Sequence, residues 1–506
     1  MSDDVGGVES GWTLSTEQWI GLIVGIVLFG LFQVLPPIAP ITAMGMRGAG
    51  LFILFACWLF TTPLPMYAVC FLVMGLAPLL GVIGMEKAMA YLGSWINLFL
   101  LGAFVLGRNL DRTQAARRLA LWVCSLKIMK HRPWTFFTIF TLVTCVSPVL
   151  LCSSIVATVV FTTIAISFFE AIGVKKGDRF GSIMVLAVTW AATAGSMIFA
   201  WGTVINLFSM GVIAKQTGYQ LGMLEWMYYG VVVAGVSYLV FWLVCRFVVR
   251  VDVKQMKEVL EPDFIIEERK KLGPMSSGEK ASIIVMCVAI LCWFLPEIVT
   301  LTAPGPVAKW LKTYLTWPTT SLVLAAACTI IPVRINGEKR MLLNWPEWTK
   351  SVEWGVLAII AAGLILGDVL SNNATGIPQF FMNTVGGLVK GGGGEYILLF
   401  LVVGLGCLMT EAMSNFGLIA VFIPLAMSIS TATGVGNPVA IAICATGAYN
   451  QSFALPLSPV MAIAFGSGWV NPKDAIKFGF LLDVLVGLGL AFIAYPILKM
   501  IIPMPG

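Results

Sequence analysis

Long apolar runs separated by short polar loops fill almost the whole of this sequence. A chain inside the hydrocarbon core of a bilayer has no water to bond to, so its backbone N–H and C=O groups must pair internally. About 20 apolar residues are enough for one helical crossing. Because 59% of the 506 residues are hydrophobic and only 11% are charged, we expect lipid as the main solvent and α-helix as the structure. The runs lie near residues 18–38, 49–61, 64–84, 92–107, 133–170, 181–214, 227–249, 281–300, 319–333, 352–370, 396–430, 438–470 and 479–501.

The positions of lysine and arginine indicate how these helices are oriented. We treat 133–170 and 396–430 as re-entrant hairpins, which enter and leave on one side, and every other run as one crossing. One face then carries 24 of the 31 Lys and Arg residues, and such an excess marks the cytoplasmic side. The sequence therefore predicts an all-α polytopic protein of the inner (plasma) membrane, with about 11 transmembrane helices, two re-entrant hairpins, a cytoplasmic N-terminus and an external C-terminus.

A weak internal repeat divides the chain into two halves. A shift of 261 residues pairs 153–176 with 414–437, and eight of these 24 positions are identical. The two copies begin on opposite faces, so they are inverted-topology repeats, which are typical of secondary transporters. The expected organisation is a tail and first transmembrane helix (1–48), a first inverted repeat with its hairpin at 133–170 (49–249), a cytoplasmic linker (250–280), and a second inverted repeat with its hairpin at 396–430 (281–506).

Polar and helix-breaking residues recur at matching places in the two halves. Residues 147–154 and 414–417 would form the hairpin tips, and 195–206 and 454–468 would interrupt a helix in each half. Unpaired N–H groups at the start of each second hairpin arm suit a carboxylate or an oxyanion. Carbonyls of the unwound segments could hold Na⁺. The alternative is that these serines and glycines only allow helices to pack closely.

Several of these segments resemble the divalent anion:sodium symporter family of the ion transporter superfamily. Thr410-Glu411-Ala412-Met413-Ser414-Asn415 is similar to the family's T-E-x-x-S-N-T tip. Phe465-Gly466-Ser467-Gly468, followed by Lys473-Asp474 and Gly479-Phe480, is similar to its C-terminal signature, and Gly202-Thr203-Val204-Ile205-Asn206 stands where the family has G-T-P-P-N. The resemblance implies elevator-type alternating access, a homodimer, and Na⁺ as the coupling ion of an anion symporter.

The same resemblance implies the site residues. The substrate would be bound by Ser153, Ser154, Ser414, Asn415, Thr203, Ser458 and Pro459. Sodium would be bound by Ser153, Gly202, Asn206, Ser414 and Asn415.

The tips depart from the family pattern. The first reads Ser153-Ser154-Ile155 and the second Ser414-Asn415-Phe416, so one Asn and both Thr of the S-N-T motif are replaced. A more apolar pocket is the expected result. A C4-dicarboxylate, a tricarboxylate, sulfate and a sulfonate all remain candidates, and Na⁺-independent anion exchange is the alternative to symport.

Other residues limit the remaining function classes. The single histidine, His131, and eleven scattered cysteines without a CxxC pair argue against an enzyme, a zinc site or any other cofactor. Nucleic-acid binding would need a basic face with aromatic or polar side chains that contact the bases, and the sequence shows none. A channel is the other transport class, and saturable uptake driven by a gradient would separate the two. Two intramembrane carboxylates stand out: Glu411 is expected to bond to the hairpin backbone, and Asp483 to hold a proton or pair two helices.

Overall fold

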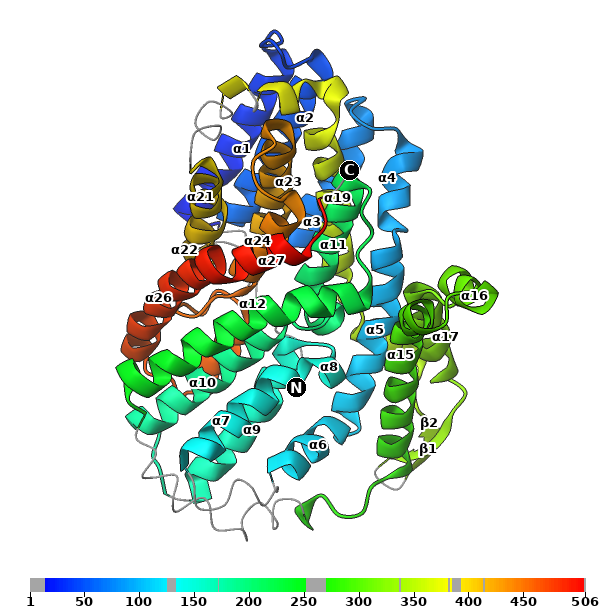
Figure 1. Ribbon diagram of the computed structural model, residues 1–506, viewed down its shortest axis with the longest axis vertical. Helices are drawn as coiled ribbons and strands as arrows, with labels where there is room; N and C mark the ends of the chain where they lie inside the picture. The colour runs from blue at the N-terminus through cyan, green and yellow to red at the C-terminus, as the bar shows by residue number, and fades with distance from the viewer. Residues whose placement is uncertain are drawn as a thin grey trace.

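A computed structural model describes residues 14–124, 133–171, 173–251, 270–335, 338–380, 383–384, 393–412 and 415–504 of the chain. Most of this is helix (Figure 1). Within the described ranges, nine helices are long and apolar enough to cross a membrane. The prediction of an all-α polytopic membrane protein is confirmed. The nine are Thr16–Val34, Ala43–Thr61, Met85–Arg112, Pro133–Leu151, Met223–Val249, Ser277–Thr302, Trp354–Ser371, Asn415–Thr433 and Pro472–Ile501.

The elements of the first half follow the apolar runs closely. They are α1 (Thr16–Val34), α2 (Ala43–Thr61), α3 (Met66–Leu79), α4 (Met85–Leu92), α5 (Trp95–Arg112), α6 (Ala115–Cys124), α7 (Pro133–Val146), α8 (Pro148–Leu151), α9 (Ser154–Ala171), α10 (Arg179–Gly195), η2 (Ala200–Gly202), α11 (Val204–Thr217), α12 (Met223–Leu243) and η3 (Val244–Val249).

The second half begins after the linker, most of which lies outside the described residues. Its elements are α15 (Ser277–Thr302), α16 (Pro306–Tyr314), α17 (Trp317–Ala327), β1 (Pro332–Ile335), β2 (Glu338–Met341), α18 (Trp345–Ser351), α19 (Trp354–Ser371), η4 (Asn373–Thr375), α21 (Gly394–Leu399), η5 (Phe400–Gly404), α22 (Leu405–Met409), α23 (Asn415–Thr433), α24 (Pro438–Asn450), α25 (Pro459–Gly466), α26 (Pro472–Gly489), η6 (Leu490–Ala494) and α27 (Tyr495–Ile501).

Helix starts are set by capping side chains. Ser15 and Ser276 cap α1 and α15 in capping boxes, in which the serine oxygen accepts a backbone N–H and a Gln or Glu side chain three residues later accepts the cap's own N–H. Asn471 caps α26, whose first residue is a proline. These local signals fix where these three helices begin.

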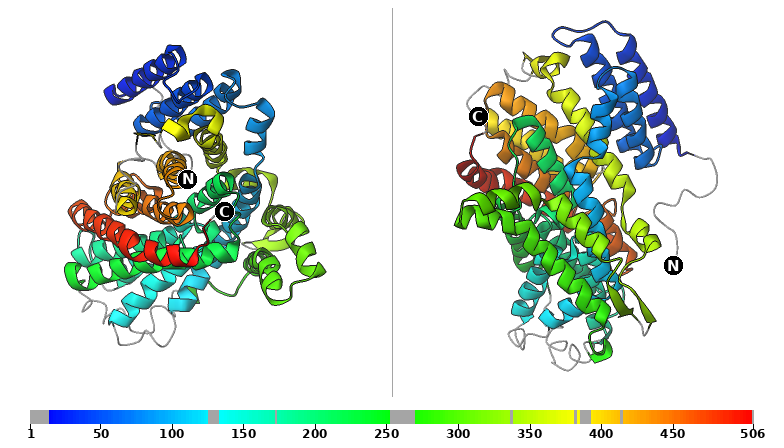
Figure 2. Two further views of the ribbon diagram at one scale, coloured as in Figure 1. Left: turned by 45° about the horizontal axis from the view of Figure 1, so that its top comes forward. Right: turned by 90° about the vertical axis from the view of Figure 1, so that its right-hand side faces the viewer.

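The helices form two groups in space. In the first, α1 packs on α2, α3 on α19, and α5 on α15 and α17. In the second, α10 packs on α7, α9 and α12, and α26 packs on α12 and α22. Figure 2 shows α1 and α2, in dark blue, at the outer edge of the first group. Helices α11, α19 and α23 pack on one another where the two groups meet.

Helices α7 and α9 lie side by side in the lower part of Figure 1 and are joined through α8. The chain reverses at Cys152, which has a left-handed backbone (φ +50°). This helical hairpin occupies the predicted range 133–170. In the second half, α21, η5 and α22 precede a turn at residues 410–412 and α23 follows it. Whether either hairpin is re-entrant stays a prediction.

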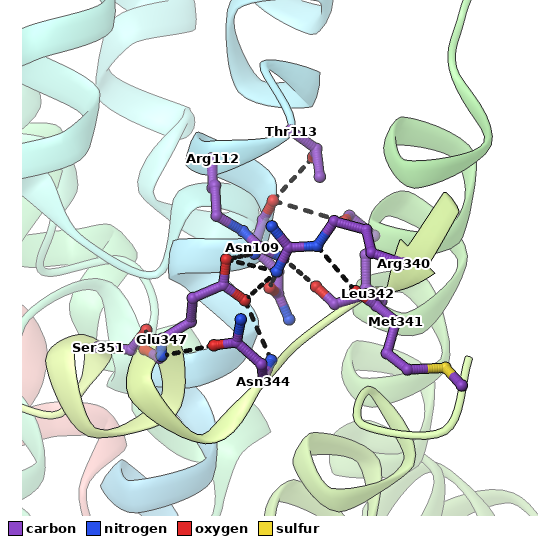
Figure 3. A network of polar contacts seen from close by, with 10 residues as sticks. Asn109, Arg112, Thr113, Arg340, Met341, Leu342, Asn344, Glu347 and Ser351 are labelled. Atoms are coloured by element: carbon purple, nitrogen blue, oxygen red, sulfur yellow. Dashed lines mark hydrogen bonds and ion pairs between the residues drawn. The ribbon is translucent and has the colours of Figure 1, made fainter. Parts of the chain in front are cut away.

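A two-stranded antiparallel ribbon is one part of the fold that the apolar runs did not predict. Strands β1 and β2 pair from Pro332↔Met341 to Ile335↔Glu338. A polar network at its base ties α5, β2 and α18 together (Figure 3). In it, Glu347 accepts hydrogen bonds from Arg340 and pairs with Arg112. Short amphipathic segments of this kind have too few apolar residues to stand out in a hydropathy reading.

Candidate functional site

The helix begun by α10 is interrupted between Gly195 and Val204, inside the predicted break. Asn206 folds back from α11 and donates through Nδ2 to the carbonyls of Ser196 (2.8 Å) and Phe199 (2.9 Å). Its Oδ1 is buried and has no hydrogen-bond partner. A Cβ added at Gly202 would lie 2.4 Å from the Ser196 oxygen, so only glycine fits there. The first break therefore presents one free, buried acceptor oxygen.

The first hairpin tip lies against this break. Ser153 Oγ accepts the N–H groups of Ile155 (3.2 Å) and Val156 (3.4 Å), so it caps α9 in the manner of an N-cap. Ser154, the first residue of α9, is buried. Trp201 of the break donates through Nε1 to the Val149 carbonyl at 2.9 Å. A side chain of the break thus holds the tip in place.

In the second half a carboxylate makes the corresponding connection. Glu411, at the turn after α22, accepts the backbone N–H groups of Phe453, Ala454 (2.9 Å) and Leu455 (2.6 Å). These three residues lie in the non-helical segment between α24 and α25, where their N–H groups have no helical carbonyl to bond to. The expectation that Glu411 bonds to the hairpin's own backbone is wrong. It bonds to the break, because that segment offers the free N–H groups.

The other predicted residues occupy varied positions. Thr203 is extended and precedes α11. Ser458 is buried and caps α25 by accepting Met461 N–H at 3.3 Å, while Pro459 is exposed. Asn415 Oδ1 accepts from the Thr410 hydroxyl at 2.7 Å. Ser414 lies outside the described residues.

The two breaks contact each other directly. Asn450, the last residue of α24, donates through Nδ2 to Ser196 Oγ and to the Thr193 carbonyl (3.3 Å). Trp190 of α10 donates to the Phe453 carbonyl at 3.0 Å. The structure therefore brings Asn206 and Gly202 of one half close to the segment 451–458 of the other.

The hairpins and breaks also pair reciprocally. Helix α9 packs against α25, and α23 packs against α11. Each second hairpin arm thus lies on the second part of the other half's broken helix. A two-fold relation between the halves would produce this pattern.

Sequence reasoning missed Asn450 and Trp201. Asn450 ends a fully apolar helix, and a polar residue in that position is a usable signal. No sequence signal marks Trp201, because a tryptophan in an apolar run is normally a core residue or a membrane-interface residue.

Positive side chains are missing from this region of the sequence. Between Gly391 and Pro472 there is no Lys, Arg or His. An anion bound there would depend on backbone N–H groups, hydroxyls and amides, as at a helix N-terminus.

The sequence profile of the family described as "Sodium:sulfate symporter transmembrane region" matches residues 16–501. The chain belongs to this family. The resemblance to the divalent anion:sodium symporters is thereby confirmed.

Relatives within the family cover the chain almost end to end. A protein of Staphylococcus saprophyticus named "Sodium-dependent dicarboxylate transporter SdcS" is 25% identical over 491 residues, which is 94% of this chain and 91% of that protein. Its namesake in Staphylococcus aureus (strain MRSA252) is 25% identical over 507 residues, with 96% and 92% covered. Both names describe transporters, as the family description does.

Proposed function

We propose that this chain is a Na⁺-coupled symporter of a small dianion, with a C4-dicarboxylate as the first candidate. The observation that carries the proposal is the meeting of two helix breaks and two hairpin tips, to which the second half contributes no Lys, Arg or His between Gly391 and Pro472. Family membership and the names of the relatives point the same way. The substrate would be held by Ser153, Ser154, Thr203, Ser414, Asn415, Ser458 and Pro459.

Sodium enters this scheme as a co-transported substrate. Asn206 Oδ1 is a buried acceptor with no donor, and a monovalent cation would satisfy it. Gly202 lets the neighbouring backbone approach closely. We assign the first Na⁺ position to Ser153, Gly202 and Asn206, and the second to Ser414 and Asn415.

The altered tips argue for a test of more than one anion. Ile155 and Phe416 stand where the family has threonine hydroxyls, and each removes a hydrogen-bond donor. A more apolar pocket suits a different or less polar anion. A sulfate or sulfonate permease and a Na⁺-independent exchanger are the second candidates.

The mechanism and assembly follow the family. We propose alternating access of the elevator type, in which α7–α12 and α21–α27 move as a unit against α1–α5 and α15–α19. The reciprocal contacts of α9 with α25 and α23 with α11 support two inverted repeats. A homodimer in the plasma membrane, with a cytoplasmic N-terminus and an external C-terminus, completes the proposal.

Uptake into liposomes tests the function. The purified protein is reconstituted, and labelled succinate uptake is measured with an inward Na⁺ gradient and again with choline in place of Na⁺. We expect saturable uptake that needs Na⁺. Counterflow into succinate-loaded vesicles without Na⁺ would instead indicate exchange, and failure of both would reject the dicarboxylate and move the test to sulfate and sulfonates.

Single substitutions test which residues bind Na⁺. Asn206→Ala and Asn415→Ala are expected to raise the Na⁺ concentration for half-maximal uptake at least about tenfold, since each removes an oxygen ligand worth ~1.5 kcal/mol or more. Ser167→Ala is the control, because its Oγ bonds only to the Thr163 carbonyl on the far part of α9. Equal Na⁺ dependence in all three variants would contradict the assignment.

A further inference from the structure

Asp483 is a buried carboxyl that has no role in the site described above. It lies in the middle of α26 and has no exposed surface, and no N–H or O–H donor of the described residues bonds to either of its oxygens. An isolated ionised carboxylate in such surroundings is very unfavourable. The protonation state of Asp483 therefore needs an explanation.

The face of α26 that carries Asp483 points at Glu411. Gly479, one turn earlier, packs so closely on the second break that a Cβ there would lie 2.4 Å from the Phe453 oxygen. Gly487, one turn later, packs on Cys407 of α22, with 3.4 Å from that Cβ position to Sγ. Asp483 lies between these contacts and next to Glu411, which is the residue that joins α22 to the break.

The described elements that pack on α26 offer no positive charge to balance the pair. The helices that pack on α26 are α12, α22 and α10, together with η5. Helix α12, α22 and η5 contain no Lys, Arg or His, and Arg179 of α10 lies at that helix's first residue and reaches the Val249 carbonyl. The two lysines of α26, Lys473 and Lys477, are exposed in its first turns.

The other titratable groups around the pair are neutral types or are bonded elsewhere. Cys407 is the thiol next to the carboxyls, and Tyr449 lies beyond it. The titratable side chains of α12 are bonded elsewhere or exposed. Glu225 bonds to Tyr219 and to Gly222 N–H, and Tyr229 lies by Tyr219. Tyr238 bonds to Thr141, and Tyr228 is exposed.

The hydrogen bonds then decide which carboxyl is ionised. Glu411 accepts three N–H groups, which stabilise a carboxylate. Asp483 accepts none. Two like charges side by side in a buried site cannot both persist, so the group without donors is the one that takes a proton.

We propose that Asp483 holds a proton and donates it in a hydrogen bond to the Glu411 carboxylate, so that the pair is a proton-binding site inside the second half. The O–H bond stays on Asp483, and the negative charge stays on Glu411, which continues to bind the break. This site is independent of the anion that the protein carries.

Infrared spectroscopy of the reconstituted protein at neutral pH tests the proposal. Asp483→Asn keeps the shape of the side chain and removes the acid. We expect it to lose one protonated-carboxyl C=O band relative to the wild type. Asp474→Asn, in the first turn of the same helix, is the control and should lose none. A full-strength band in Asp483→Asn would overturn the assignment.

Isotope labelling of the wild type gives an answer that does not depend on a variant folding. Protein made with aspartate labelled with ¹³C at the side-chain carboxyl should show the protonated band shifted to lower frequency. A shift on glutamate labelling instead would place the proton on Glu411 and overturn the proposal. Absence of any protonated aspartate band would do so as well.

Discussion

Glu347 shows how single side chains hold the predicted cytoplasmic end of the molecule together. It accepts two hydrogen bonds from Arg340 Nη2, one of them 2.6 Å long, and the N–H of Asn344 at 3.0 Å. It also pairs with Arg112 at the end of α5 (Figure 3). Burial alone would raise the pKa of Glu347, but the bonds from Arg340, Arg112 and the Asn344 backbone lower it overall.

A lowered pKa makes this network sensitive to acid. A carboxyl whose pKa is lower in the folded state contributes stability above its unfolded pKa of about 4.3, and loses it as pH falls through the folded value. We expect the melting temperature of the wild type to fall on acidification from about pH 5 to below 4. Glu347→Gln should have a lower melting temperature at pH 7 and a flatter acid dependence. Glu86→Gln, an exposed glutamate of α4, is the control, and equal acid profiles in all three proteins would contradict the prediction.

For single residues, the sequence predicted where a side chain lies along a helix better than which group it bonds to. Glu353 directly precedes α19 and Asp368 lies in its last turn, so both carboxylates flank an apolar run, and Arg108 pairs with Asp111 one turn later. Glu411 was recognised as a structural carboxylate, but its partners are 42 to 44 residues further along the chain. No local pattern encodes a bond over that separation.

At Gly195, helix α10 approaches the first hairpin arm so closely that no residue with a side chain would fit. A Cβ at Gly195 would lie 1.6 Å from the carbonyl oxygen of Cys145 in α7. The oxygen that the Cβ would meet belongs to the backbone of α7, so no side chain can move aside. The end of α10 and the hairpin arm are therefore fixed against each other by the absence of a side chain.

Gly195→Ala should consequently destabilise the protein. Alanine favours a helix over glycine by about 1 kcal/mol, but here the overpacking should cost ~3 kcal/mol or more. Gly235→Ala, on α12 with nothing within 4 Å of the added Cβ, is the matched control and should leave the melting temperature unchanged or raise it. Thermal unfolding in detergent measures both, and similar melting temperatures would show that α7 can shift.

The polar and helix-breaking residues predicted the first interruption at 195–206, whereas the second lies at 451–458 and most of the predicted 454–468 is helix α25. Among the elements, the apolar runs predicted the long helices. They did not predict α4, α16 and α18 or the β1–β2 ribbon, which are short and mixed in polarity. The glycines that allow close approach, such as Gly195 and Gly479, could not be told from ordinary membrane glycines, because the partner backbone is unknown from sequence.

One ion-pair cluster joins the two groups of helices. Asp368 of α19 pairs with Lys87 of α4 at 2.6 Å and with Lys215 of α11 at 3.0 Å. Lys215 also donates to the Tyr91 hydroxyl. Helix α11 carries the first break, whereas α4 and α19 belong to the other group. Movement of one group against the other would have to separate Lys215 from Asp368.

Breaking this link should therefore speed transport. On the proposed elevator mechanism, Asp368→Asn removes ~0.4–1 kcal/mol of stabilisation from this conformation. The rate of uptake at saturating substrate should rise about two- to fivefold, with little change in KM. Asp111→Asn, which breaks the exposed pair with Arg108 inside α5, is the control. Identical rates in the two variants would mean that the cluster does not restrain the moving step.

The reciprocal packing of α9 on α25 also has a consequence for biosynthesis. Helix α9 ends at Ala171 and its partner begins at Pro459, so about 290 residues must still be translated before the contact can form. At roughly 5–20 residues per second this takes about 15–60 s. During that interval the first half lies in the bilayer with an unfinished surface, and final assembly can only follow membrane insertion of the last helices.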